Sequence, residues 1–98
     1  MHYMVTKLSF DPDFSPISSR KDLLALCEKI RRRFPVSIFP CESPDQEGAV
    51  SIAFAAVHPK ADALSRFADE IGSFCEKEGV GRIACESSII DHIDNLDE

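Results

Sequence analysis

The chain has 98 residues, of which 44% are hydrophobic and 29% are charged, and its formal net charge is −6. This length suffices for one domain with a modest core, and this composition excludes a disordered chain. No apolar run approaches the roughly 20 residues that span a bilayer, and no secretory signal is visible, so we expect a single domain over residues 1–98 in the cytoplasm, away from the membrane.

The segment from Tyr3 to Phe10 alternates apolar and polar positions with the period of a half-buried β-strand. Asp11-Pro12 ends that strand, and residues 11–17 contain two prolines among other turn-forming residues. We therefore expect a loop that leads into the next element.

Residues 18–37, SSRKDLLALCEKIRRRFPVS, predict one amphipathic helix that is followed directly by a strand. Ser18 or Ser19 can cap the first turn, and Pro35 prevents the helix from continuing. Apolar residues recur on one helical face at three-and-four spacing: Leu23, Leu26, Cys27, Ile30 and Phe34. The helix is expected to bury that face.

Val36 to Cys41 predicts a short strand, and its flanking prolines suit the edge of a sheet. Residues 42–48 are polar and rich in turn formers, which indicates the tip of a hairpin. Ala49 to Val57 is the most continuously apolar strand and is expected at the sheet centre. Its two faces differ, with Val50, Ile52 and Phe54 on one and the small Ser51, Ala53 and Ala55 on the other.

A second helix is expected to begin at His58-Pro59, with proline at its first position, and to end before Gly79. Its apolar face consists of Leu64, Phe67, Ala68, Ile71 and Cys75. Residues 81–93 predict the last strand, with Ile83, Cys85, Ser87 and Ile89 on one face.

The predicted element order is β, α, β, β, α, β. It closes most simply into an α+β ferredoxin-like fold, a four-stranded antiparallel sheet of order 4-1-3-2 with both helices on one face. The other sheet face then has no helix to cover it, and it would carry small, uncharged side chains: Val5, Ser51, Ala53, Ala55 and Ala84. We expect a homo-oligomer that forms through this open face.

The first helix is basic although the chain is acidic, because residues 20–33 carry a net +4 and the rest of the chain −10. Clustered positive charge on one helix is typical of phosphate contacts, although a solvated helix face gives the same pattern. The candidate nucleic-acid-binding residues are Lys21, Lys29, Arg31, Arg32 and Arg33. The small residues of the predicted central strand offer no aromatic platform for bases on the sheet.

No catalytic, metal or cofactor site is predicted. The four cysteines form no CxxC pair, and the three histidines stand far apart in the sequence without the spacing of a zinc site or a triad. We interpret the cysteines as structural thiols, with a disulfide or a reactive thiol as the alternative, and the histidines as solvated or capping groups. Acidic residues in the 42–48 segment are explained by a polar loop, so we expect no enzyme.

The serine-basic helix start, the Arg31-Arg32-Arg33-Phe34 run and Val36-Ser37 at the next strand resemble the YlxP-like family of small bacterial proteins (domain of unknown function 503). The resemblance implies a ferredoxin-like fold and a bacterial cytosolic protein associated with translation and ribosome maturation genes. A tryptophan that the family carries in its hairpin has no counterpart here, so its role is not carried over.

These observations leave two functional hypotheses. In the first, the protein is an interaction module that binds ribosomal RNA or a ribosomal protein through the basic first helix. In the second, it is a small-molecule-binding or regulatory domain that oligomerises through the open sheet face, a reading that rests on analogy between folds.

Overall fold

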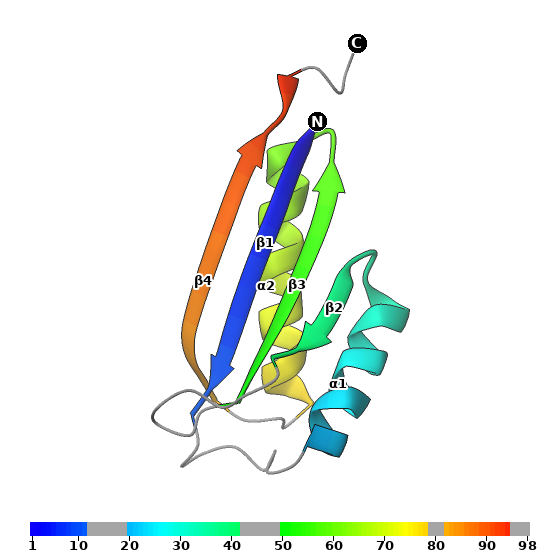
Figure 1. Cartoon of the computed structure of the whole chain (residues 1–98), viewed down its shortest axis with the longest axis vertical. Helices are drawn as coiled ribbons and strands as arrows, with labels where there is room; N and C mark the ends of the chain where they lie inside the picture. The colour runs from blue at the N-terminus through cyan, green and yellow to red at the C-terminus, as the bar shows by residue number, and fades with distance from the viewer. Residues whose placement is uncertain (12–19, 42–49, 79–81, 95–98) are drawn as a thin grey trace.

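The computed structural model describes residues 1–11, 20–41, 50–78 and 82–94, which form four strands and two helices (Figure 1). In chain order these are β1 (His2–Phe10), α1 (Arg20–Arg33), β2 (Ser37–Pro40), β3 (Ser51–His58), α2 (Ala61–Lys77) and β4 (Ile83–His92). Every predicted element is present, and the bounds differ from the predicted ones by one to three residues at most ends. Residues 12–17 of the loop predicted at 11–17, the serine cap, the hairpin tip and Gly79 lie outside the described residues.

The four strands form one antiparallel sheet in the order β2-β3-β1-β4, which confirms the predicted 4-1-3-2 arrangement. β1 and β3 lie at the centre, and their register pairs His2 with His58 and Ser9 with Ser51. β2 is an edge strand of four residues, as its prolines predict, and it covers only half the length of β3. The other edge is formed by β4, which pairs with β1 along its whole length.

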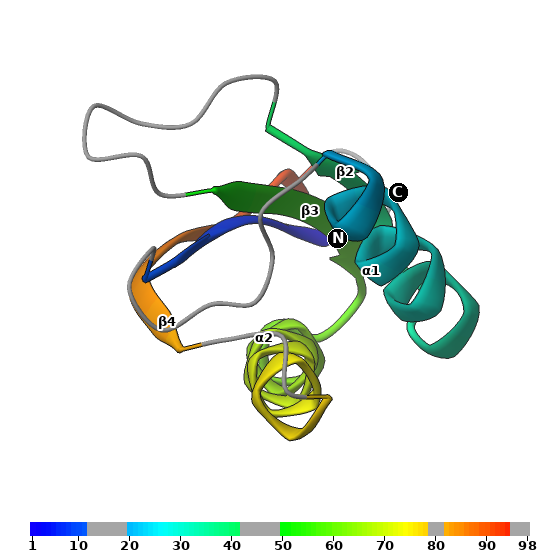
Figure 2. The same cartoon turned by 90° about the horizontal axis from the view of Figure 1, so that it is seen from below.

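Both helices lie on the same side of the sheet, α2 under the central strands and α1 beside β2 (Figure 2). The sheet face that they cover is apolar because β1, β2 and β3 turn alternate residues toward it. Its fully buried side chains come from all three strands: Met4, Leu8, Phe10, Ile38, Ile52 and Phe54. The helices add the residues that their three-and-four spacing predicts, including Leu23, Leu26, Cys27, Ile30, Leu64, Ile71 and Cys75. One continuous core therefore holds the sheet and the helices together.

The last strand contains a β-bulge that the sequence pattern did not reveal. Ser9 pairs with Cys85 and Phe10 pairs with Ile83, so Ala84 is an extra residue without a partner in β1. The bulge turns Ile83 toward the helices, where it packs against the core, while Cys85, Ser87 and Ile89 lie on the opposite face. The prediction that Ile83 shares a face with those three residues is therefore wrong.

The start of α2 also differs from the prediction. The helix begins at Ala61 with Lys60 in an extended conformation at the N-cap, so Pro59 precedes the helix instead of occupying its first position. Lys60 makes no capping bond with its side chain, but its own N–H donates to Nδ1 of His58 at 2.9 Å. The imidazole of His58 thus accepts from the backbone just before the helix.

Candidate nucleic-acid interface

Among the basic side chains of α1 that the structure describes, Arg31 makes the most contacts with other residues of the protein. Its guanidinium donates to the carboxylate of Glu28 one turn earlier and, through Nη2, to the backbone carbonyl of Ile38 at 2.6 Å. The same guanidinium stands 5.6 Å from the ring centre of Phe39. These contacts join α1 to the edge of β2, in addition to the apolar core that holds the helix on the sheet.

Two further basic residues of α1 lie against α2. Arg33 places its guanidinium 5.3 Å from the ring centre of Phe74, and Nζ of Lys29 lies 3.7 Å from the carboxylate of Glu78. Phe34 meets Phe74 edge to face at 6.0 Å between ring centres. The C-terminal half of α1 is therefore joined to the C-terminal half of α2 by an aromatic pair with charged contacts around it.

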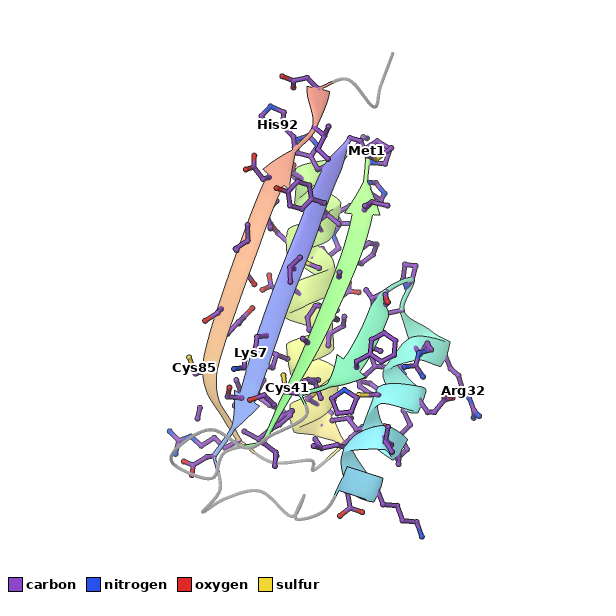
Figure 3. The ribbon with its side chains drawn as sticks, viewed as in Figure 1. Met1, Lys7, Arg32, Cys41, Cys85 and His92 are labelled. Atoms are coloured by element: carbon purple, nitrogen blue, oxygen red, sulfur yellow. The ribbon has the colours of Figure 1, made fainter. Side chains whose placement is uncertain are left out.

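Arg32 and Lys21 are left to face solvent. The Arg32 side chain is 82% exposed and, among the residues that the structure describes, approaches only Glu28, at 3.9 Å. It reaches away from the molecule in Figure 3. Lys21 is also exposed but stands at the other end of the helix, about 16 Å along the axis from Arg32 at roughly 1.5 Å per residue. The five predicted residues thus lie on one helix, but they do not form a single compact patch.

The open sheet face carries more large apolar side chains than its small central residues suggest. Val5, Ala53 and Ala55 lie there as predicted, together with the exposed residues Phe39, Val57 and Ile89. Ser51 also belongs to this face but is buried at 3% exposure, and Ala84, which was predicted here, is the unpaired bulge residue. Phe39 is 66% exposed and forms one cross-strand row with Ala53, Lys7 and Ser87. Because Arg31 reaches Phe39 at the β2 edge, this face and the basic helix meet at one place.

Two hollows accompany these surfaces. A cleft of about 570 Å³ lies beside the contact between the C-terminal ends of the helices, and its lining combines aromatic, acidic and basic side chains, with Arg33, Phe74, Asp69 and Glu70 among them. A shallower apolar groove of about 410 Å³ lies where β2 stops short of the end of β3, lined by Tyr3, Pro35 and residues 55–57. Across the described parts of the chain, no group of three side chains is arranged to hold a metal ion.

Comparison with known protein families gives one match. Residues 18–87 match the DUF503 family, which is described as a protein family of unknown function. The chain belongs to the DUF503 family. No curated protein matches the chain.

The matched region of this DUF503 protein starts just before α1 and ends within β4, so it includes the whole basic helix. The family confirms the resemblance seen at the helix-strand junction. In the described part of this DUF503 chain, no helix is both long and apolar enough to cross a membrane.

All four cysteines of this DUF503 protein are free thiols, and two of them are buried in the core. Burial raises the pKa of the Cys75 thiol to about 12, with smaller contributions from Cys27 and Glu76. Burial likewise raises the pKa of Cys27, and the nearby Arg31 opposes that shift in part. Both groups stay protonated at neutral pH and pack as small apolar side chains, as the sequence predicts.

The three histidines, which are far apart in the sequence, form one row across the sheet. His2 pairs with His58 on one side and with His92 on the other. Nδ1 of His2 lies 3.1 Å from the carbonyl of Pro59, and the His2 and His92 rings are 5.7 Å apart. Nε2 of His92 lies 2.9 Å from the Asp94 carboxylate. Only the strand register reveals this row, because spacing along the chain carries no sign of it.

Proposed function

We propose that this DUF503 protein is a cytoplasmic interaction module that binds ribosomal RNA through the basic residues of α1. The observation that supports this proposal is the exposed positive charge of α1, a helix of net +4 in a chain of net −6. Lysine and arginine side chains contact phosphates through their charge, and such contacts position a protein on RNA without reading its sequence. The proposal is for a binding protein rather than an enzyme.

The five basic residues would have different roles in this binding. Arg32 and Lys21 are exposed and can meet phosphates without giving up a strong partner. Lys29 and Arg33 contact α2 and can contribute charge from there. Arg31 holds α1 to β2, so it acts mainly by positioning the helix.

Co-sedimentation of the protein with ribosomes and with ribosomal RNA across a salt series tests the proposal. The variant Lys21→Glu/Arg32→Glu reverses two exposed charges of α1, and we expect it to lose binding at least tenfold. The matched control Lys60→Glu/Lys77→Glu makes the same change in net charge near the two ends of α2. Binding that is equal in both variants, or that does not weaken as salt rises, would contradict the assigned surface.

One observation favours a second function. The open sheet face exposes Val5, Phe39, Val57 and Ile89 together, which is more apolar surface than scattered residues give. A regulatory domain that binds a small molecule and oligomerises through this face would bury them. Val57→Lys would then convert the oligomer to a monomer, and a monomeric parent protein would exclude this second function.

A further inference from the structure

The two edges of the sheet are built differently. β2 is only four residues long, contains Pro40, and has its Ile38 carbonyl occupied by the Arg31 guanidinium. α1 packs beside this strand. Short length, proline and an occupied carbonyl all prevent an edge strand from pairing with another chain.

β4 has none of these three protections, and its bulge at Ala84 precedes the stretch from Cys85 to His92, which pairs regularly with β1. It is ten residues long, contains neither proline nor lysine, and is exposed from Ala84 to His92. Most proteins shield an edge of this length, because its free N–H and C=O groups are a template for another strand. β4 is therefore the edge of this sheet that a further strand can extend.

The alternation of hydrogen-bonded pairs between β1 and β4 identifies which backbone N–H and C=O groups of β4 are unpaired. Ile93 donates its N–H to the carbonyl of Met1 at 2.9 Å, which continues the β1–β4 ladder beyond the strand end. Because hydrogen-bonded pairs alternate in an antiparallel ladder, the odd-numbered residues from Cys85 to Asp91 bond to β1. The even-numbered residues 86–92 direct their N–H and C=O groups outward. The His92 N–H is already bonded to the Asp91 carboxylate at 2.8 Å, so Glu86, Ser88 and Ile90 hold the free N–H groups.

We propose that β4 pairs antiparallel with β4 of a second copy of this chain, around a two-fold axis at Ser88. In that register Ser88 faces Ser88 of the partner subunit, and Glu86 faces Ile90 of the partner subunit on either side of the axis. All three free N–H groups then gain a carbonyl, and the two four-stranded sheets join into one continuous sheet. A two-fold, self-complementary contact of this kind closes into a dimer.

Charge and geometry select this register over its neighbours. An axis at Glu86 would set two Glu86 carboxylates against each other, and an axis at Ile90 would set Glu86 against Asp94. An axis at Ser87 would place Ile90 opposite the bulge residue Ala84, where the ladder is irregular. An axis at Ile89 would require the His92 N–H, which is already bonded.

The first test uses charge at the axis and light scattering. We expect the parent protein to be a dimer, and Ser88→Lys or Ser88→Asp to weaken dimerisation at least tenfold because like charges then meet at the axis. An equimolar mixture of the two variants should restore a dimer. Because both variants lose the Ser88 hydroxyl bond to buried Thr6 equally, that restoration cannot be a stability effect. A monomeric parent protein, or a dimer that persists in both single variants, would overturn the proposal.

The second test identifies which residues of the two β4 strands face each other, and it does not depend on the Ser88 variants. In the proposed dimer Cys85 faces Asp91 of the partner subunit in a non-hydrogen-bonded pair, where the Cα atoms are about 4.5 Å apart, close enough for a disulfide. With oxidised glutathione as the oxidant, Asp91→Cys should form a disulfide-linked dimer through native Cys85, which is exposed. Ile89→Cys is the matched control, because it faces Cys85 only if the axis lies at Ser87. Crosslinking of the control alone would overturn the register, and crosslinking of neither would overturn the contact.

This contact is distinct from oligomerisation through the open sheet face. Val57 lies on β3, away from the β4 edge, so Val57→Lys should leave the β4 dimer intact. A dimer that Val57→Lys abolishes and that the Ser88 variants leave unchanged would refute the edge contact and support the open-face oligomer instead.

Discussion

At the scale of single residues, Arg31 contributes more to the stability of the fold than the neighbouring Arg32 of α1 does. It satisfies a backbone carbonyl of β2 and pairs with Glu28, whereas Arg32 is 82% exposed. We predict that Arg31→Ala lowers the free energy of unfolding by about 1–2 kcal/mol, and that the matched change Arg32→Ala lowers it by less than about 0.5 kcal/mol. Urea denaturation followed by circular dichroism measures both, and equal losses would show that the contact with Ile38 contributes nothing.

Cys75 makes the stability of the protein fall as the pH rises into the alkaline range. Its pKa is raised from 9.0 to about 12 by burial, so the unfolded chain releases this proton above pH 9 while the folded protein keeps it. The contribution of Cys75 is therefore fully present below pH 9, and it is lost as the pH rises toward 12, by at most about 1.4 kcal/mol per pH unit. Denaturation at a series of pH values should show a shallower decline for Cys75→Ala than for the parent protein, and parallel declines would contradict the assignment.

At the scale of elements, the bulge in β4 determines which side chains face the core. Removing Ala84 would leave Ile83 opposite Phe10 and restore a regular ladder, so we predict that this deletion changes the free energy of unfolding by less than about 1 kcal/mol. Deleting Ser87 instead shifts one half of the strand by one residue and moves its side chains to the wrong face. That variant should lose more than about 2 kcal/mol, which chemical denaturation can compare directly, and similar losses in both would argue against the bulge.

The bulge also shows where sequence reasoning succeeds and where it stops. Periodicity, prolines and the element order were enough for the helices, the sheet order and the faces of β3, since each depends on local spacing or short connections. An extra residue in a strand shifts the alternation without altering composition, so the face of Ile83 could not be predicted. The row of His2, His58 and His92 was missed for a related reason, because it depends on the register between strands.

The charges of α1 could likewise be predicted only in part from the sequence. Spacing along α1 predicted which residues are charged and that they lie outside the apolar stripe. It could not show that Arg31 bonds to Ile38, that Arg33 stacks on Phe74 or that Lys29 meets Glu78, because each partner is fixed by packing between elements. The sequence therefore predicts a charged surface, and the structure shows which of its charges are free.

At the scale of the whole molecule, both helices share one core with the sheet, so we expect the protein to unfold in a single transition. Leu26 of α1 and Ile71 of α2 are both almost fully buried. Leu26→Ala and Ile71→Ala should each move the same transition, by about 2–5 kcal/mol, when it is followed by circular dichroism and by hydrogen exchange in both helices. Two separate transitions in either variant would show that α1 and α2 unfold independently.

The pairing of β1 with β4 joins the two ends of the described chain, with His2 opposite His92 and the start of β1 beside the end of β4 (Figure 1). Such a pairing closes the longest possible loop, and its chain entropy must be lost before any contact in that ladder is gained. High contact order of this kind slows folding. A circular permutant that links the end of β4 to the start of β1 would turn this most distant pairing into a local hairpin, so the same native sheet would be reached faster.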